Sequence, residues 1–248
     1  MKSILRLHRS WLNVFLAGLL FAVVPLRAAD DAMDQPGQAV KTRQLNFLAP
    51  DAVSATTLLC PPPLPDSAEQ AADLNEVRAV YHVASSNDMA AAYSEKKFSI
   101  FTFTPVVGDF FQSNNLPRTT AFFEKVQLDA ETVTDLGKLY FHRPRPFTVD
   151  TNLANGKLEK SFSYPSGHST ESMVIALVLA DLIPDKHDTI IAKARNIGWH
   201  RVEIARHYMT DIYAGRTLAQ AIVREMKTNA DFQKDFAGAQ AEIAAAQK

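Results

Sequence analysis

Basic side chains and histidines gather in three short segments of this sequence, at residues 138–146, 165–168 and 201–211. Phosphoryl transfer needs such a set, because the charge of the transferring group is spread over three oxygens that fixed cations and backbone N–H groups stabilise. An in-line displacement also needs one group to attack and another to protonate the departing oxygen. The three segments together predict a site for phosphoryl transfer.

Three cations and one tight turn are the candidates for holding the phosphate. Lys138, Arg145 and Arg201 supply positive charge, and each arginine presents a planar fork that can hold two oxygens. Ser166 and Gly167 stand before an apolar run, where the N-terminus of a helix would offer free N–H groups. Glycine at this position lets an anion approach the backbone closely.

Two histidines, His168 and His207, remain for attack and proton transfer. Taken singly, each segment also has an ordinary structural explanation. The cations can be solvated surface charges, and residues 165–168 can be a turn before a capped helix. His207 and Asp211 can be an (i, i+4) surface pair of small energetic value. Only the combination favours a catalytic site.

The elements that must position these residues follow the helical period. Apolar residues recur at helical spacing, and no series of alternating β-branched runs is present. The sequence predicts helices over residues 66–94, from 117 onward, and over 130–140, 169–182, 188–199, 211–226 and 232–247. Residues 98–111, rich in aromatic side chains, are expected to form a buried connecting segment. The predicted fold class is therefore all-α, a compact helical bundle.

The first thirty residues have the pattern of a secretory signal peptide. A positively charged start precedes an apolar run over residues 11–24, and a small residue ends the segment where a signal peptidase would cut. We predict a signal peptide over residues 1–28 and a mature protein that begins near Ala29, in the periplasm or outside the cell. An uncleaved membrane anchor is the alternative.

The rest of the chain is expected to form one domain preceded by an arm. Residues 29–65 end in a proline-rich stretch and predict an extended arm over the surface, and residues 66–248 the catalytic domain. Cys60 is the only cysteine, which excludes an internal disulfide and a zinc–thiolate cluster. The formal net charge of −1 disfavours nucleic-acid binding as a general role. No segment after the signal peptide is apolar enough for stable membrane insertion.

In this order, the three segments resemble the signature of the PAP2 phosphatase superfamily, which vanadium haloperoxidases share: Lys-x6-Arg-Pro, then Pro-Ser-Gly-His, then Arg-x5-His-x3-Asp. The sequence around residues 58–67 and 229–233 also looks like that of bacterial class A non-specific acid phosphatases. The resemblance covers most of the mature chain and is strongest over residues 138–215. It implies a helical bundle of the PAP2/haloperoxidase type.

The resemblance also implies a role for each matched residue. His207 resembles the family's nucleophile, Asp211 the acceptor that orients its ring, and His168 the general acid. The remaining matched residues resemble the phosphate-binding groups: Lys138, Arg145, Ser166, Gly167 and Arg201. A phosphohistidine intermediate would form and be hydrolysed by water, with no metal ion and no cofactor.

Four residues depart from the family's usual pattern or add to it. His200 stands where the family usually has serine, and Arg206 stands where a small residue commonly precedes the nucleophile. His142 and Arg143 add positive charge to the first segment. We expect these changes to leave the catalytic set whole and to affect substrate preference. Arg206 narrows the leaving-group side, binds a second anionic group or points to solvent, and the last is the preferred interpretation.

The predicted function is a secreted acid phosphatase acting on small phosphorylated substrates. A vanadate-dependent haloperoxidase is an alternative, which the length and the resemblance outside the three segments disfavour. A peripheral envelope-lipid phosphatase and a catalytically inactive phosphate-binding protein are two others. The missing membrane helices argue against the first of these, and the intact catalytic set argues against the second. A homo-oligomer is compatible with the sequence.

Overall fold

The computed structural model describes residues 44–248, so the predicted signal peptide and the first part of the predicted arm lie outside the described residues. Within residues 44–248 the secondary structure is helical and no β-strand is present, which confirms the all-α prediction. None of the helices in this part of the chain is both long enough and apolar enough to cross a membrane.

Seven longer helices alternate with short helical turns in the described residues. The longer ones are α2 (Ala68–Val83), α3 (Ser86–Ser94), α5 (Pro117–Phe141), α7 (Gly167–Leu182), α8 (His187–Glu203), α9 (Met209–Met226) and α10 (Ala230–Ala246). The short ones are α1 (Ala55–Leu58), η1 (Ile100–Phe103), α4 (Thr104–Val107), α6 (Pro146–Val149), η2 (Thr151–Leu153) and η3 (Pro184–Lys186).

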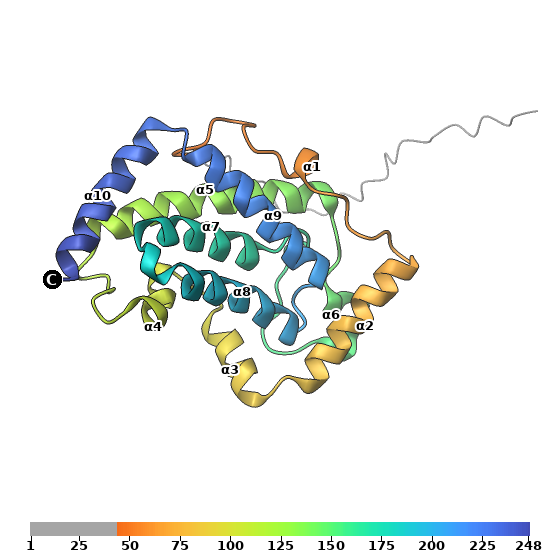
Figure 1. Cartoon of the computed structure of the whole chain (residues 1–248). Helices are drawn as coiled ribbons and strands as arrows, with labels where there is room; N and C mark the ends of the chain where they lie inside the picture. Colours follow the sequence, from red (N-terminus) through yellow and green to blue (C-terminus); the bar gives the residue numbers. More distant parts are fainter. Residues whose placement is uncertain (1–43) are drawn as a thin grey trace, which may run out of the picture. The chain divides into compact units, whose positions relative to one another are not determined.

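Helix α7 lies at the centre of these helices (Figure 1). Its residues 173–180 are apolar and mostly buried, as expected for a helix that packs against others on several sides. It contacts α5, α8 and α9, while α10 covers α5. Ser166 caps α7, and its Oγ accepts a hydrogen bond from the backbone N–H of Ser169 at 3.4 Å. The start of α7 is thereby fixed between neighbouring helices.

The buried apolar side chains form two clusters. The larger one joins α5, α7, α9 and α10 with residues 47–59. The smaller one joins α2 to the end of α8 and the start of α9, and consists of Leu74, Val77, Phe147, Leu153, Val202, Ala205, Tyr208, Met209 and Ile212. Burying one large apolar side chain contributes about 1.5–3 kcal/mol. The segment 201–211, which holds predicted site residues, therefore rests on an apolar cluster separate from the main core.

Two helix boundaries differ from the sequence prediction. The helix predicted over residues 66–94 is in fact two helices, because Ser85 begins a new one with a capping box. The Oγ atom of Ser85 accepts from the N–H of Asp88 at 3.2 Å, and Asp88 Oδ2 accepts from the N–H of Ser85 at 3.0 Å. The two helices predicted after residue 117 are one helix, α5, because its buried face continues without interruption.

The described part of the predicted arm, residues 44–65, enters the core and does not only cover the surface. The carboxylate of Asp129, fully buried on α5, accepts hydrogen bonds from the N–H groups of Phe47 at 2.8 Å and Leu48 at 3.1 Å. The ring of Phe47 packs edge-on against Phe232 of α10, with 5.4 Å between centroids. A buried carboxylate that binds backbone N–H groups anchors this segment to α5.

Candidate active site

The structure brings the three predicted segments together at the N-terminus of α7. Lys138 lies in the last turn of α5, and its Nζ is 3.2 Å from the point where a Cβ on Gly167 would stand. The N–H of Ser166 donates a hydrogen bond to the backbone carbonyl of Asp211 at 3.1 Å. The end of α5, the start of α7 and the start of α9 therefore meet at one place.

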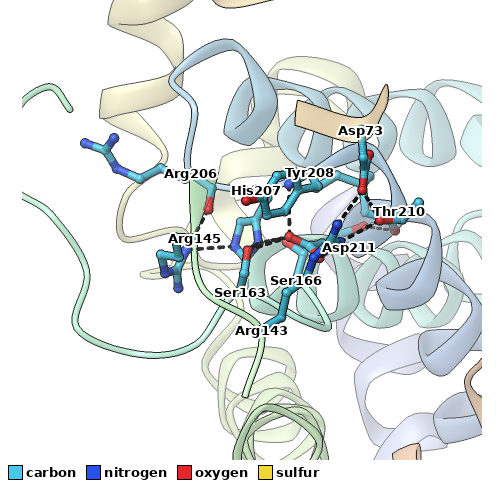
Figure 2. Close-up of polar contacts among 12 residues, drawn as sticks. Asp73, Arg143, Arg145, Ser163, Ser166, Arg206, His207, Tyr208, Thr210 and Asp211 are labelled. Atoms are coloured by element: carbon cyan, nitrogen blue, oxygen red, sulfur yellow. Dashed lines mark hydrogen bonds and ion pairs between the residues drawn. The ribbon is translucent and has the colours of Figure 1, made fainter. Parts of the chain in front are cut away.

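His207 and Asp211 form a buried pair, as the sequence predicted (Figure 2). The Nδ1 atom of His207 lies 3.2 Å from Asp211 Oδ2. His207 precedes the N-cap residue of α9, and Asp211 lies in the first turn of that helix. Because a carboxylate accepts at Nδ1, the ring hydrogen sits there and the lone pair sits on Nε2.

Asp211 is held by more groups than His207 alone. Its Oδ2 accepts a hydrogen bond from Ser163 Oγ at 2.5 Å and one from the N–H of Tyr208 at 2.9 Å. Its Oδ1 accepts one from Arg143 Nη1 at 2.7 Å. These bonds engage both oxygens and fix the carboxylate before any substrate is present (Figure 2).

Arg143, which the sequence suggested as extra positive charge, is neutralised by two buried carboxylates. Besides Asp211 it binds Asp73 of α2, with 2.6 Å between Nη2 and Oδ2. The guanidinium also lies 3.8 Å from the centre of the Tyr208 ring. Arg143 therefore supports Asp211, and its charge is already compensated before any substrate binds.

Arg145 lies beside Nε2 of His207, the ring nitrogen that does not face Asp211. Its Nη1 is 3.2 Å from His207 Nε2 and donates to the backbone carbonyl of Arg206 at 2.9 Å. Its Nε and Nη2 donate to the carbonyl and the Oγ of Ser161, at 2.7 and 3.0 Å. The guanidinium is thus fixed next to the nitrogen that carries the lone pair.

Burial and charge keep this pair in its reactive form. Burial, followed by the charge of Arg145, lowers the pKa of His207 to about 3, so the imidazole is neutral in mildly acidic solution. Burial opposes ionisation of Asp211, but the hydrogen bond from His207 and the charge of Arg143 outweigh it and lower its pKa to about 2. A neutral imidazole beside an ionised carboxylate is the state a histidine nucleophile needs.

The first turn of α7 offers backbone donors next to Lys138. The N–H groups of Gly167 and His168 are in this first turn and have no acceptor within the helix. Lys138 Nζ is 3.4 Å from Asp135 Oδ1, so it already has an ionic partner at the edge of the site. Any side chain at residue 167 would meet this lysine, which explains why glycine suits the position.

His168 and Arg201 are held by backbone carbonyls at the end of α3. His168 Nε2 lies 3.2 Å from the carbonyl oxygen of Glu95, and Arg201 Nη2 donates to the carbonyl oxygen of Ala92. The Nε of Arg201 is buried without a hydrogen-bond partner. Burial, followed by the charge of Arg201, lowers the pKa of His168 well below its usual range. Burial lowers the pKa of Arg201 to about 10, so the guanidinium remains charged near neutral pH.

His200, the departure from the family pattern, helps to fix the end of α3. Its Nδ1 lies 2.6 Å from Glu95 Oε2, and Lys193 Nζ binds Glu95 Oε1 at 2.7 Å. Burial opposes ionisation of Glu95, but the bonds from His200 and Lys193 outweigh it and lower the pKa of Glu95. The carbonyl that contacts His168 is therefore held in place from α8.

Arg206 does not point to solvent, so the preferred interpretation of this residue is wrong. It is 2% exposed, and its side chain points away from His207 (Figure 2). Its Nε lies 2.8 Å from Glu159 Oε2, and its Nη1 donates to the carbonyl of Ile204 at 2.8 Å. A buried arginine with these partners fixes the loop that follows η2.

The structure places all eight predicted site residues around one point, but it adds partners that the sequence did not reveal. These are Asp73, Glu95, Arg143, Ser161 and Ser163. Asp73 lies 70 residues from Arg143, and Glu95 lies 73 residues from His168, so no motif spacing indicates them. Arg143 was visible inside the first segment, but its charge alone could not show that two carboxylates surround it.

The chain is similar to a known protein family and to curated acid phosphatases. The family model described as PAP2 superfamily matches residues 127–232. A non-specific acid phosphatase from Providencia stuartii is 29% identical over 254 aligned residues, which span 95% of this chain and 96% of that protein. An acid phosphatase from Zymomonas mobilis subsp. mobilis is 36% identical over 117 residues, 44% of each chain. A non-specific acid phosphatase from Salmonella typhi is 29% identical over 57% of this chain and 59% of its own.

One solved structure shares the fold. It is the crystal structure of a transmembrane PAP2 type phosphatidylglycerolphosphate phosphatase from Bacillus subtilis, with a TM-score of 0.51 and 20% sequence identity. The match covers 70% of this chain and 89% of that one. At this identity the similarity concerns the fold, and it supports the predicted helical bundle of the PAP2 type.

Proposed function

Because residues 127–232 form a PAP2 superfamily domain, we propose that the protein is an acid phosphatase that hydrolyses small phosphomonoesters through a phosphohistidine at His207. One observation carries this proposal: the two ring nitrogens of His207 have different partners. Nδ1 faces Asp211 at 3.2 Å, and Nε2 faces Arg145 at 3.2 Å. The nitrogen with the lone pair thus lies where a cation would hold the oxygens of a phosphoryl group.

The groups proposed to bind that phosphoryl group are called here the phosphate cradle. They are the side chains of Lys138, Arg145 and Arg201 and the backbone N–H groups of Gly167 and His168. Ser166 caps the helix that presents the two N–H groups. Fixed cations and oriented N–H groups supply the charge stabilisation that the transition state requires, so the proposed reaction uses neither a metal ion nor a cofactor.

The reaction proceeds by two displacements at phosphorus. In the first, His207 Nε2 attacks, an N–P bond forms, and the bond to the leaving oxygen breaks while His168 gives that oxygen its proton. In the second, water attacks phosphorus, neutral His168 takes the proton of the water, and the N–P bond breaks. Inorganic phosphate is released and both histidines return to their starting states.

Substrate binding prepares His168 for its role as acid. In the free site, burial and the charge of Arg201 disfavour the protonated imidazole, which lowers its pKa. A bound phosphate dianion compensates the cations of the cradle and therefore favours protonation of His168. His168 must also exchange the carbonyl of Glu95 for the leaving oxygen.

An activity panel on the purified protein tests the proposal. It contains p-nitrophenyl phosphate, a nucleotide, a phosphatidate, and bromide with peroxide and vanadate, each with and without EDTA. We expect phosphatase activity that survives EDTA and is inhibited by vanadate. Activity that is lost with the chelator and restored by a divalent ion would contradict the mechanism, and bromide oxidation without phosphatase activity would favour a haloperoxidase.

We also propose that the protein is exported to the periplasm or the medium after cleavage near residue 28. Support comes from the charged start, the apolar run and the small residue at the end of residues 1–28. N-terminal sequencing of the exported protein should begin near Ala29. A sequence that begins at Met1 would show an uncleaved anchor instead.

A further inference from the structure

Glu171 is a carboxyl group on α7 that the proposed mechanism does not use. It follows Gly167 by about one helical turn, so the two residues share a face of the helix. Its Oε1 lies 3.3 Å from the point where a Cβ on Gly167 would stand, and Lys138 Nζ lies 3.2 Å from the same point. The carboxyl group of Glu171 therefore borders the phosphate cradle.

The immediate partner of Glu171 is a neutral amide. Gln127 of α5 donates a hydrogen bond from Nε2 to Glu171 Oε2 at 3.0 Å. Lys138 pairs with Asp135 instead, at 3.4 Å. Among residues 44–248, no cationic side chain forms an ion pair with Glu171. An ionised Glu171 would therefore carry its negative charge beside the cradle without a direct ionic partner among the described residues.

The other charged groups near Glu171 come from its own helix and from its neighbours. Glu131, Asp135 and Lys138 act on it from α5, and His168 precedes it on α7. Burial is the largest influence and raises the pKa of Glu171 to about 7, with Gln127 and Lys138 acting in the opposite direction. Glu171 is thus uncharged in acidic solution and becomes ionised around neutral pH.

We propose that Glu171 sets the upper limit of the pH range in which the phosphate cradle binds its anion. This inference rests on the proposed function, because the cradle is part of it. When Glu171 is uncharged, the positive charge of the cradle is unopposed. When Glu171 is ionised, it places a negative charge a few ångströms from a bound phosphate, where like charges in a partly buried site repel strongly.

Proton linkage turns this arrangement into a measurable pH dependence. Bound phosphate and ionised Glu171 disfavour each other, so phosphate binding holds the proton on Glu171. Phosphate affinity must then fall as pH rises above the pKa of Glu171 in the free protein. The ionisation of phosphate itself also contributes, but it is the same for every variant and cancels in a comparison.

The test measures the Kd of inorganic phosphate by titration calorimetry between pH 5 and pH 9 for the native protein and for Glu171→Gln. Glutamine keeps the shape of the side chain and removes the ionisation. From pH 6 to pH 8 we expect Kd to rise about fivefold more in the native protein than in the variant, which corresponds to a rise of about one unit in the pKa of Glu171 when phosphate binds. Equal rises in the two proteins would overturn the proposal.

Two further variants make the test independent of one substitution. Gln127→Leu removes a hydrogen bond that favours ionised Glu171, so the rise in Kd should move to higher pH, and an unmoved rise would contradict the proposal. Glu124 is exposed on α5, the helix that also carries Gln127, so Glu124→Gln should show the same pH dependence of Kd as the native protein. Because phosphate binding is measured directly, a native protein that binds phosphate but cleaves no ester would contradict the proposed function and leave the test of Glu171 intact.

Discussion

The half of the site around His207 and the half around His168 are built in different ways. His207 is oriented by Asp211, whose oxygens bind Arg143, Ser163 and the N–H of Tyr208. Arg143 and Ser163 are buried, and Tyr208 belongs to the apolar cluster that joins α2, α8 and α9. The half around His168 instead relies on the carbonyl groups at the end of α3.

The difference indicates which contacts persist during the reaction. The His207 half is complete without substrate, because every oxygen of its carboxylate is engaged. In the other half, His168 and Arg201 bind carbonyls that a phosphate would have to replace, and Arg201 Nε has no partner at all. We infer that the first half is preorganised for attack, while the second is assembled when phosphate binds.

The largest effect is expected from removal of the predicted nucleophile. His207→Ala should lower kcat by about 10⁴-fold or more for every substrate, because no N–P bond can form. Turnover of p-nitrophenyl phosphate and of an alkyl phosphate by the purified variant measures this. A variant with activity within tenfold of the native protein would place the nucleophile elsewhere.

Removal of His168 should have a smaller effect that depends on the leaving group. Loss of a general acid typically costs 10²–10⁴-fold. His168→Ala should show that loss with an alkyl phosphate, whose departing oxygen needs a proton, and much less with p-nitrophenyl phosphate. The ratio of kcat/KM for the two substrates is the readout. The same loss for both substrates would show that His168 does not protonate the leaving oxygen.

Arg143 supports only the half of the site around His207, and its replacement should lower the stability of the fold. Arg143→Met leaves Asp73 and Asp211 buried without their cation, which should lower the free energy of unfolding by about 3–5 kcal/mol. A displaced Asp211 should also lower kcat, by up to about 10²-fold. Denaturant unfolding and steady-state kinetics measure both effects.

An arginine on α9 provides the control for Arg143. Arg224 is exposed, so Arg224→Met should change the free energy of unfolding by about 0.5 kcal/mol or less. If Arg143→Met were no more destabilising than this control, the buried network around Asp211 would not support the His207 half as described.

The smallest expected effect is the uptake of a proton when phosphate binds. In mildly acidic solution the neutral form of His168 is favoured in the free protein, because burial and the charge of Arg201 lower its pKa, and bound phosphate raises that pKa. Glu171 is already protonated in acidic solution and does not contribute to the proton uptake. Calorimetry in two buffers of different ionisation enthalpy should show that the native protein takes up as much as about one proton more than His168→Ala, because any proton released by phosphate itself is common to both proteins. The uptake should shrink in His168→Ala, and unchanged uptake would exclude His168 as its source.

The sequence predicted the fold class, and it indicated the eight candidate residues that lie together in the structure, because both depend on local pattern. Helical periodicity depends on residues that are close together in the sequence, and the three segments have fixed internal spacing. It failed at Arg206, because a residue next to the nucleophile in sequence can point the opposite way in space. It also joined α2 to α3, since the apolar spacing continues through the break that Ser85 introduces.

The remaining partners depend on tertiary contacts that no local pattern encodes. Asp73 reaches Arg143 from α2, and Glu95 reaches His168 and His200 from the end of α3. The sequence does not indicate Glu171 for a different reason, since one acidic residue in an apolar helix has no distinctive spacing. Its importance depends on how close α5 brings Lys138 and Gln127.

Trapping the covalent intermediate tests the central claim most directly. The native protein and His168→Ala would be mixed with p-nitrophenyl phosphate labelled at phosphorus and quenched within milliseconds in base. A phosphohistidine withstands base and is lost in acid, so the label can be located by mass spectrometry of peptides kept at high pH. The label should lie on His207 in both proteins. A label on any other residue would contradict the account.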